Sequence, residues 1–379
     1  MASTWPTAKL GDVIDLFDSQ RVPLNSRQRH ERQGKYPYYG AQGVIDHVDG
    51  YIFDGRYILV AEDGENLNSK KLPLALFASG RFWVNNHAHI LRGKEDIADD
   101  TFLLACLNNA DIKPFVTGAA QPKLSQGNLR LIGIPLPPLP IPRRIAGILS
   151  AYDELIENSQ RRIKILESMA SALYREWFVH FRFPGHEHHP RVPSPLGEIP
   201  KGWEVTTLGR LVEIKKGKNI TKDTIRDGNV PVVAGGIAPA YFHDAPNTQS
   251  PVITISASGA NAGFVKLYYL DVWASDCSYI DLSATPHVFY YYLWLDYRRA
   301  SVTHLQRGSA QPHVYPKDLA QLEALGVPEE LLGAFMSQVA PIFGLMMRLT
   351  AKIQNLRRTR DLLLPRLLSG QIDVEAIAS

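Results

Sequence analysis

A short motif occurs twice in this chain, once in each half. It reads GAAQPK at 118–123 and GSAQPH at 308–313, half a chain apart in a sequence of 379 residues. Each copy precedes an apolar stretch and then a long segment with helical spacing. Solenoid repeats recur about every 20–50 residues, which is a much shorter period. The chain is therefore predicted to contain one domain plus one helix, duplicated in tandem.

Positions outside the motif repeat as well. The aligned pairs are 37–40 with 231–235, 60–64 with 255–259, Trp83 with Trp273, and Ile90 with Ile280. The residues between them differ, because NNHAH at 85–89 is replaced by SDCSY at 275–279. Because the flanking positions repeat while the polar residues between them differ, the sequence predicts two sites of one type that recognise different targets.

Both domains are predicted to be rich in β-structure. In the first, runs of aromatic and β-branched residues alternate with glycines, which is typical of strands. The runs lie at 36–39, 44–48, 51–53, 57–61, 81–84 and 88–91. The segment 99–109 has helical spacing, whereas the polar segment 21–35 is predicted to be a loop.

A long helix is predicted after each domain, because apolar residues recur there with the heptad spacing of a coiled coil. The predicted seams are Ile145, Leu149, Tyr152, Ile156, Ser159, Ile163, Leu166, Ala170, Leu173 and Trp177 in the first helix, and Leu332, Phe335, Val339, Ile342, Met346, Leu349, Ile353, Leu356, Arg360, Leu363 and Leu367 in the second. Pro341 lies inside the second helix and is expected to kink or split it, since proline lacks the backbone N–H.

Antiparallel packing of the two helices would satisfy both seams. The predicted fold class is therefore α+β, with two similar β-rich domains separated by two long helices that form an antiparallel coiled coil with pseudo-twofold symmetry. The predicted segments are a first domain at 1–140, a first helix at 141–182, a linker at 183–202, a second domain at 203–327, and a second helix with a C-terminal tail at 328–379.

Composition narrows the class of protein. Hydrophobic residues make up 45% of the chain, which is typical of globular proteins and too many for a disordered one. The net charge of +3 permits an anionic partner without requiring one. Two cysteines in different halves argue against a disulfide framework and fit a reducing compartment. Without a signal pattern or an apolar run of about 18 residues, the sequence predicts a soluble, cytoplasmic protein with no membrane span.

No residues form a convincing catalytic set. The segment 209–218 resembles a phosphate loop only superficially, because Lys218 is followed by Asn219 and not by the Ser or Thr that binds magnesium. The chain lacks both the Asn-Pro-Pro-aromatic stretch of adenine methyltransferases and the Asp…Glu-x-Lys arrangement of nucleases. The histidines at 186–189 have no fixed ligand spacing, so a solvated loop is preferred to a metal site. No catalytic residue, metal or cofactor is predicted in this chain.

Four segments together resemble the specificity subunit of type I restriction–modification systems. They are 118–124 (GAAQPKL) with its continuation to 150, the helix end at 170–178 (ASALYREWF), the opening of the second domain at 196–203 (LGEIPKGW), and 362–370 (LLLPRLLSG). They follow the family's order along the whole chain. The departures are 142–144 (PRR), where the family usually has Gln after the proline-rich stretch, and Pro341 in the second helix.

This resemblance implies that each domain is a target-recognition domain that binds one half of a bipartite double-stranded DNA target. It implies that the helices set the spacer and dock two adenine-N6 methyltransferase (M) subunits, and that motor and nuclease (R) subunits join the complex. S-adenosylmethionine, ATP and magnesium are then expected in the partner subunits and not in this chain.

The DNA contacts are expected on polar and basic residues, since these read base edges and hold phosphates. The candidates for base contacts are Tyr39, Gln42, Asn85, Asn86 and His87 in the first domain, and Ser258, Asn261 and Asp276 in the second. The candidates for phosphate contacts are Lys70, Lys71, Lys123, Lys215, Lys216, Lys218 and Arg226. Each has a structural alternative, because loop Asn and Ser often form turns and surface Lys is usually only solvated. Gln121 and Gln311 are explained equally well by a turn that joins domain and helix.

Two other functions remain open at this point. One is a scaffold whose coiled coil and β-rich domains bind proteins, without sequence-specific DNA binding. The other is an enzyme with motifs that the sequence does not reveal, such as a nuclease or a fused methyltransferase.

Overall fold

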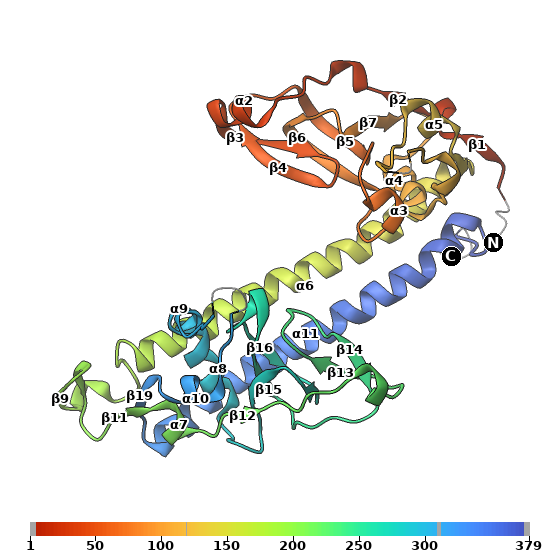
Figure 1. Cartoon of the computed structure of the whole chain (residues 1–379). Helices are drawn as coiled ribbons and strands as arrows, with labels where there is room; N and C mark the ends of the chain where they lie inside the picture. The colour runs from red at the N-terminus through yellow and green to blue at the C-terminus, as the bar shows by residue number, and fades with distance from the viewer. Residues whose placement is uncertain (1–4, 119, 309–311, 375–379) are drawn as a thin grey trace. The chain divides into compact units, whose positions relative to one another are not determined.

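The chain folds into two compact units. The structure is a computed structural model that describes residues 5–118, 120–308 and 312–374, so Gln311 lies outside the described residues. Unit 1 comprises Met1–Glu157 and Ile353–Ser379, and unit 2 comprises Asn158–Lys352. Each unit contains one β-rich domain and a part of both long helices, α6 (Pro140–Phe178) and α11 (Glu329–Ser369) (Figure 1).

A six-stranded sheet with the order β2-β7-β5-β6-β3-β4 forms the centre of unit 1. Its strands are β2 (Ile14–Leu16), β3 (Gln33–Gly40), β4 (Gly43–Val48), β5 (Phe53–Ala61), β6 (Ala75–Val84) and β7 (Ala88–Gly93). Neighbours are antiparallel except β3 and β6, which pair in parallel with Tyr38 opposite Trp83. The predicted strand runs lie within these strands, except that the run at 51–53 overlaps β5 only at Phe53.

Apolar side chains cover both faces of this sheet. On one face, Ile58 packs in the same core as Phe102 of α4 (Asp100–Asn109). Asp99 caps the N-terminus of α4, since its carboxylate accepts from two backbone N–H groups of the first turn. On the other face, the rings of Phe53 and Phe82 stack with centroids 5.5 Å apart. The helix predicted at 99–109 is confirmed.

Unit 2 repeats this arrangement with shorter strands. A four-stranded sheet has the order β12-β18-β15-β16, and a three-stranded sheet has the order β14-β13-β17. The strands are β12 (Lys215–Lys216), β13 (Val230–Val233), β14 (Tyr241–His243), β15 (Val252–Ser256), β16 (Val265–Tyr268), β17 (Trp273–Ala274) and β18 (Cys277–Ile280). β13 and β17 pair in parallel with Val232 opposite Trp273, as β3 and β6 do with Trp83 in unit 1. The predicted equivalence of the two tryptophans is therefore confirmed.

A two-stranded sheet closes each domain by joining its two ends. β1 (Thr7–Lys9) pairs with β8 (Gly133–Pro135), and β11 (Glu204–Thr207) pairs with β19 (Glu323–Gly326). A short helix after the first strand packs on a second short helix, α1 (Leu10–Val13) on α5 (Gln126–Leu131) and α7 (Leu208–Leu211) on α10 (Pro316–Ala320). A Cβ on Gly11 would lie 2.8 Å from Arg130 Cβ, and one on Gly209 would lie 2.6 Å from Ala320 Cβ. Leu10-Gly11 at the start of α1 and Leu208-Gly209 at the start of α7 occupy equivalent places, and close helix packing explains the glycine in each.

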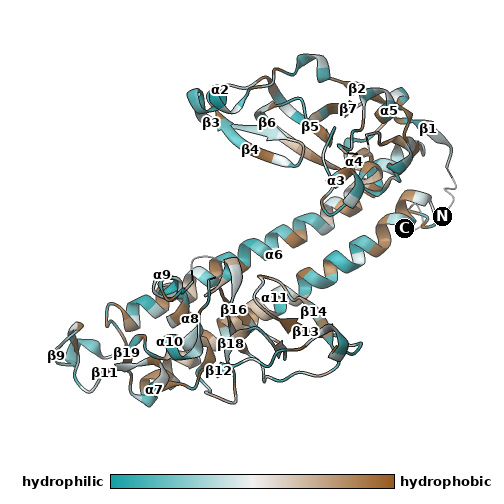
Figure 2. Cartoon of the chain, viewed as in Figure 1, coloured by the Kyte–Doolittle hydropathy of each residue, from teal (hydrophilic) through white to brown (hydrophobic). Residues whose placement is uncertain are grey.

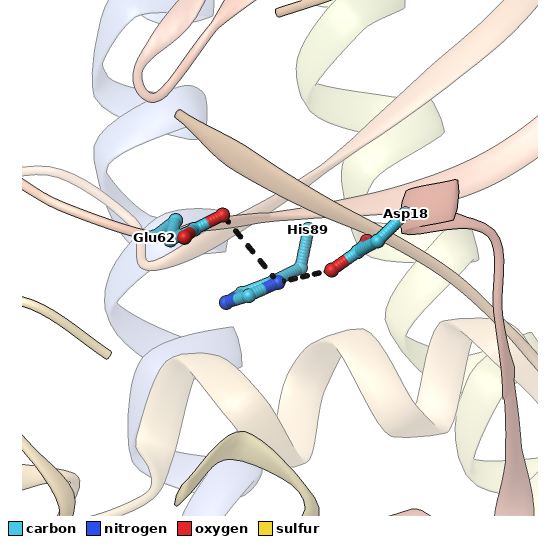
Figure 3. Close-up of side chains that lie close together, drawn as sticks. All are labelled: Asp18, Glu62 and His89. Carbon is cyan, nitrogen blue, oxygen red and sulfur yellow. Dashed lines mark hydrogen bonds and ion pairs between the residues drawn. The ribbon is translucent and has the colours of Figure 1, made fainter. Parts of the chain in front are cut away.

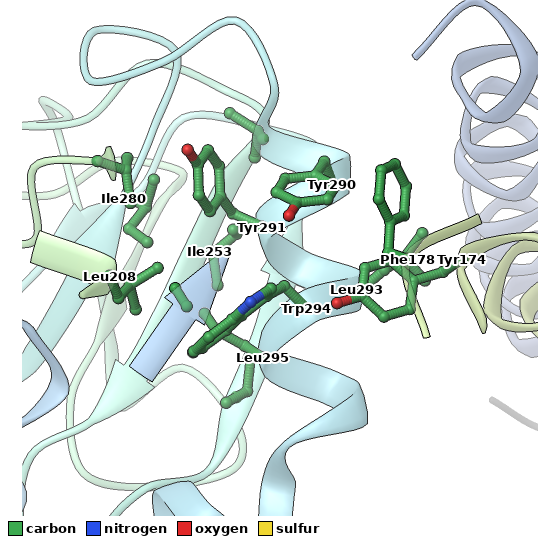
Figure 4. Packing of buried hydrophobic residues seen from close by; sticks show 14 of the residues in the cluster. Tyr174, Phe178, Leu208, Ile253, Ile280, Tyr290, Tyr291, Leu293, Trp294 and Leu295 are labelled. Carbon is green, nitrogen blue, oxygen red and sulfur yellow. The ribbon is translucent and has the colours of Figure 1, made fainter. Parts of the chain in front are cut away.

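The remaining short elements connect these parts. They are α3 (Asn66–Ser69), α8 (Val288–Tyr297), α9 (Arg299–His304), and the 3₁₀ turns η1 (Asp18–Gln20), η2 (Lys113–Phe115), η3 (His186–His188), η4 (Lys222–Thr224) and η5 (Gly259–Asn261). α8 lies in the core of unit 2, where the ring of its Tyr290 lies 4.9 Å from that of Phe178 of α6 (Figure 4).

The segment 21–35 is not only a loop, because it contains the helix α2 (Ser26–Glu31). Asn25 caps it in a reciprocal arrangement. Its Oδ1 accepts from the Gln28 N–H (2.9 Å), and the Gln28 Oε1 accepts from the Asn25 N–H (2.9 Å). This capping box is readable as Asn-x-x-Gln in the sequence, and the high charge of the segment obscured it.

Replacing Asn25 by Ala is expected to destabilise α2 by about 1 kcal/mol, because the cap loses its acceptor. Amide hydrogen exchange of the α2 residues measures this change as faster exchange. Arg27→Ala is the matched control, since the Arg27 side chain is 88% exposed on the same helix and surface substitutions usually stay within about 0.5 kcal/mol. Equal exchange rates in the two variants would contradict the capping role.

The two helix seams are confirmed, since every predicted seam residue is buried or half-buried. In unit 2, Trp177 near the end of α6 contacts Phe335 near the start of α11, with ring centroids 5.5 Å apart. In unit 1, Asp153 of α6 accepts a hydrogen bond from Arg360 of α11 (2.5 Å). Both parts of the helix pair are therefore antiparallel, and apolar and polar residues alternate along both helices (Figure 2).

Pro341 does not split the second helix, because α11 continues from Glu329 to Ser369. Of the two predicted effects, a split is wrong, because proline removes only one donor and the remaining hydrogen bonds and the buried seam hold the helix together. A kink at Pro341 stays a prediction. By length and composition alone α11 could cross a bilayer. Its apolar residues Phe335, Val339 and Phe343 lie in the core of unit 2, and 28% of its most apolar 18-residue window is buried within the described structure.

The linker at 183–202 is more ordered than predicted. β9 (Arg191–Ser194) and β10 (Gly197–Pro200) form an antiparallel hairpin there. The Ser194 hydroxyl accepts from the Leu196 N–H (3.1 Å) and donates to the Gly197 carbonyl (2.6 Å), which closes the turn. The prolines of this segment are compatible with a two-stranded hairpin because it consists of edge strands only.

Candidate nucleic-acid interface

The duplicated motif makes the same contact in both units. In unit 1 the Gly64 N–H donates to the Pro122 carbonyl (3.1 Å), and in unit 2 the Gly259 N–H donates to the Pro312 carbonyl (3.0 Å). Both glycines have a positive φ, 104° and 77°, which favours glycine. The motif therefore holds the loop that follows β5 or β15. We call residues 62–64 and 257–259 the glycine loops.

A second loop begins at an equivalent point in each unit. The Asn85 N–H donates to the Tyr39 carbonyl (2.9 Å), and the Ser275 N–H donates to the Val233 carbonyl (2.8 Å). These contacts continue the parallel pairing of β3 with β6 and of β13 with β17. We call residues 85–87 and 275–276 the variable loops, because the two units differ most in their polar residues here.

The variable loops also end in the same way, but they differ in length by one residue. The carbonyl of His87 accepts from the N–H of Glu62 (2.9 Å), and the carbonyl of Asp276 accepts from the N–H of Ala257 (3.2 Å). His87 is therefore equivalent to Asp276.

The constant spacing assumed after the tryptophans is thus wrong by one residue. That spacing placed Cys277 opposite His87 and Ile280 opposite Ile90. In the strands, Ile280 corresponds to Leu91, since each lies opposite the matching isoleucine of β15 or β5. A one-residue deletion in a loop leaves the strands unchanged, so the repeat alone did not reveal it.

A polar side-chain pair joins the glycine loop to the variable loop in each unit. In unit 1, His87 Nδ1 lies 2.6 Å from Asp63 Oδ2. In unit 2, the Ser258 hydroxyl donates to Asp276 Oδ2. Asp63 and Ser258 each directly precede the loop glycine. Asp63 and Ser258 thus occupy equivalent positions, as do His87 and Asp276, but the side chains at each position differ chemically between the units.

A buried charged network supports the loops of unit 1 (Figure 3). His89 is 1% exposed; its Nδ1 lies 2.6 Å from Asp18 Oδ2 and 3.8 Å from Glu62 Oε2, and its Nε2 donates to the Leu124 carbonyl (2.8 Å). Leu124 directly follows the duplicated motif, and Glu62 belongs to the glycine loop. The network therefore ties the motif, the glycine loop and β7 together.

Two basic side chains complete this network. Arg21 donates to Glu62 (2.7 Å) and lies 3.4 Å from Asp18, and Lys123 Nζ lies 3.2 Å from Glu62. Burial alone would raise the pKa of Asp18, but hydrogen bonds from His89 and from the backbone hold it below the usual value. Burial likewise opposes ionisation of Glu62, and Arg21 and the nearby charges lower its pKa.

Asp18, Glu62 and His89 also offer three possible metal-ligand atoms close together. Their atoms are already engaged, because both ring nitrogens of His89 have acceptors and Glu62 pairs with two cations. Arg21 and Lys123 would repel a divalent ion. The residues fit a network of ion pairs better than a metal centre.

The predicted DNA contacts of unit 1 fall into three groups. Gln42, Asn86, His87 and Lys123 are exposed. Asn85 is 6% exposed and its Oδ1 accepts from the His87 N–H (2.8 Å), so its side chain forms the turn of the variable loop. Tyr39 is half-buried with its ring 5.6 Å from that of Phe82, and burial raises its pKa.

Lys70 and Lys71 form the third group, apart from the variable loop. They line a cavity of about 420 Å³ together with residues of α4. Lys70 donates to the Ala110 carbonyl at the end of α4 (3.0 Å). The Lys70 ammonium thus lies at the C-terminus of α4, where a positive charge interacts favourably with the helix dipole.

In unit 2, Ser258 and Asp276 lie together, and Asn261 is exposed just after the glycine loop. Exposed Lys218 lies beside the variable loop, since its N–H donates to the Ala274 carbonyl (2.9 Å). Lys216 is also exposed, on the edge strand β12.

Two of the basic candidates in unit 2 are engaged within the unit. Lys215 donates to Ser283 (2.5 Å) and lies 3.6 Å from Asp281, which is 2% exposed. Arg226 pairs with Asp244 (2.9 Å). A structural role explains Lys215, whereas the Arg226 side chain is still 69% exposed.

The sequence-based selection missed the residues that hold the loops. Asp63 orients His87, and Asp18, Arg21, Glu62 and His89 form the network beneath them. The only sequence signal was the acidic pair before Gly64, because the other members come from distant segments that the fold brings together.

Known proteins resemble this chain in sequence and in fold. The family described as type I restriction modification DNA specificity domain matches residues 2–168 and 200–328. A putative type I restriction enzyme specificity subunit of Haemophilus influenzae is 32% identical over 224 residues, which cover 59% of this chain and 54% of that protein. The specificity subunit of the type I restriction enzyme MjaIX of Methanocaldococcus jannaschii is 26% identical over 287 residues, which cover 70% of this chain and 66% of that protein. The chain thus spans about half to two thirds of these relatives.

A solved structure has the same fold. The crystal structure of the type I restriction–modification system S subunit from M. genitalium matches with a TM-score of 0.65, over 97% of this chain and 96% of that one, at 17% sequence identity. The family match covers both β-rich domains and most of the first long helix. The chain therefore belongs to the family of type I restriction–modification DNA specificity proteins and carries two copies of the family's domain.

Proposed function

We propose that this chain is the DNA-reading subunit of a type I restriction–modification complex. Each β-rich domain reads one half of a bipartite duplex target, and the long helices set the spacer between the halves. The observation that carries this proposal is the duplicated frame of glycine loop and variable loop, because it holds different polar side chains at equivalent positions in the two units. A protein that reads two different half-sites needs two similar sites whose polar side chains differ.

The proposal assigns catalysis to partner subunits. Two adenine-N6 methyltransferase subunits dock on the helices, and motor and nuclease subunits complete the restriction complex. S-adenosylmethionine, ATP and magnesium bind those partners, and the assembly acts in the cytoplasm.

Salt-dependent binding to duplex DNA tests this function. With the methyltransferase partner present, the binding constant is expected to fall steeply with salt, because each phosphate contact releases counterions and contributes a slope of about 0.9 in a log–log plot. Binding that is indifferent to salt and sequence would favour a protein scaffold. Turnover of DNA by the isolated chain would favour an enzyme.

A lysine pair refines this test. Lys218→Ala is expected to lower the slope by about one contact and to weaken binding equally for all sequences. Lys201→Ala is the matched control, because Lys201 is also exposed in unit 2 but follows the hairpin strand β10, outside the candidate DNA contacts. The measurement is a fluorescence titration at several salt concentrations, and equal slopes for both variants would contradict the placement of DNA at the variable loop of unit 2.

A further inference from the structure

The two loop pairs allow an inference about which chemical group each domain reads. We propose that His87 with Asp63, and Asp276 with Ser258, are equivalent base-reading pairs, each of which presents a hydrogen-bond acceptor to the exocyclic amino group of an adenine or a cytosine. This inference rests on the proposed DNA-reading function and adds the chemistry of one base position in each half-site.

The positional equivalence comes from backbone contacts alone. His87 and Asp276 each end a variable loop and accept a hydrogen bond from the glycine loop. Asp63 and Ser258 each form an isolated β-bridge to the last residue of the duplicated motif. Four independent contacts thus place the two pairs at the same point of the repeated frame, although the residue type differs at each of the two equivalent positions.

The chemistry of the first pair follows from the tautomer of His87. A carboxylate only accepts hydrogen bonds, so Asp63 requires the proton of the neutral ring on Nδ1. Nε2 then carries a lone pair and is an acceptor. The His87 side chain is 47% exposed whereas that of Asp63 is 20% exposed, so the ring is the member that a ligand can reach. Asp63 is a positioning residue.

The chemistry of the second pair gives the same result by another route. Ser258 donates to Oδ2 of Asp276, and Oδ1 of Asp276 has no hydrogen-bond partner among the described residues. An ionised carboxylate has only acceptor capacity. Asp276 therefore presents an acceptor where His87 presents one in the other unit.

Acceptors select particular bases in the major groove. Adenine offers the N6 amino group and cytosine the N4 amino group, whereas guanine and thymine offer acceptors at their corresponding positions. Both units are thus expected to require an amino base at one position of their half-site. One residue packs against each loop pair. The Asn85 side chain accepts from the N–H of His87 in unit 1, and in unit 2 Gly235 lies so close to the glycine loop that a Cβ would be 2.8 Å from the Ser258 carbonyl oxygen.

Single substitutions with opposite donor patterns test the inference. Asp276→Asn replaces one acceptor oxygen by a donor group at equal size, and is expected to change the preferred base at one position of the second half-site only. His87→Lys replaces the acceptor Nε2 by an ammonium group, which only donates, and is expected to shift the first half-site from an amino base toward guanine. Asp271→Asn is the control, because Asp271 is an exposed aspartate of the same unit outside the loop pair, and its substitution should leave the same bases preferred.

The readout is the sequence motif of methylated adenines in host DNA when the full chain acts with its methyltransferase. A preference change of about tenfold or more at one position is expected for Asp276→Asn and for His87→Lys. Either of these variants that methylates with unchanged letters in its half-site overturns the inference and leaves the proposed function intact. If the unsubstituted chain directs no bipartite motif, the proposed function itself fails.

A second measurement covers a variant that does not assemble. The unsubstituted complex is titrated with duplexes in which single adenines are replaced by purine, or single cytosines by 2-pyrimidinone, so that only the amino group is lost. One position in each half-site is expected to lose about tenfold in affinity, and the analogue that causes the loss identifies the base. Unchanged affinity at every position outside the methylated adenines would overturn the inference.

Discussion

Replacing Phe335 by Ala is expected to destabilise unit 2 by about 3–5 kcal/mol. The Phe335 side chain is fully buried, and its ring lies against those of Tyr174, Trp177 and Phe178 of α6. Truncation removes these contacts and leaves a cavity, because rigid aromatic neighbours relax little. For a unit of this size, the melting temperature of unit 2 is expected to fall by about 10 °C.

Met347→Ala is the matched control for this prediction. Met347 lies on the same helix and is 43% exposed, so its loss is expected to change the free energy of unfolding by about 0.5 kcal/mol or less. Differential scanning calorimetry compares the two variants with the unsubstituted chain. Similar melting curves for both variants would show that burial of the helix seam does not stabilise unit 2 to the expected extent.

Replacing Asp18 by Asn is expected to destabilise unit 1 by about 3 kcal/mol, because removing one partner of a buried ion pair leaves the others uncompensated. The Asp18 side chain is 6% exposed and accepts from the Ile90 N–H as well as facing His89 and Arg21. Asp49→Asn is the matched control. Asp49 also pairs with an arginine, but its side chain is 51% exposed, and exposed pairs contribute about 0–1 kcal/mol.

The contribution of Asp18 is expected to depend on pH with a defined sign. Its pKa is lowered in the folded chain, so the unfolded chain binds the proton more readily. The stabilisation is therefore fully present above the ordinary aspartate pKa of about 4 and is lost as the pH falls through the lower folded value. Urea denaturation at several pH values should show the difference between the chain and Asp18→Asn narrowing below about pH 4. A difference that stays constant down to pH 2 would contradict this.

The sequence was sufficient to predict the duplication, the β-rich domains and the two seams. Heptad spacing depends only on local order along one helix, so even Ser159 and Arg360 were placed in the seams correctly. The capping box at Asn25 was equally local but was obscured by the surrounding charges. The hairpin in the linker was missed because its prolines argue against strands in general and not against a two-stranded edge.

The details of the candidate site were less predictable. His87 and Asp276 were selected as polar residues in a repeated frame, but their partners Asp63 and Ser258 become visible only when β5 and β15 place the glycine loops beside them. The assumption of constant spacing failed at a one-residue deletion, since loop length is free where strand pairing is not. For Asn85 the sequence allowed either a base contact or a turn, and only the burial of its side chain in the structure favours the turn.

The division of the chain has a consequence for its synthesis. Unit 2 is one continuous segment, whereas the core of unit 1 includes Leu367, Leu368 and Val374 together with the first domain. A ribosome that adds about 5–20 residues per second thus synthesises the whole of unit 2 before it adds the last core residues of unit 1. The first domain to be translated is therefore the last to complete its core. Until Leu367 and Leu368 are added, the apolar side chains of Ile145 and Leu149 lack these partners and are accessible to chaperones.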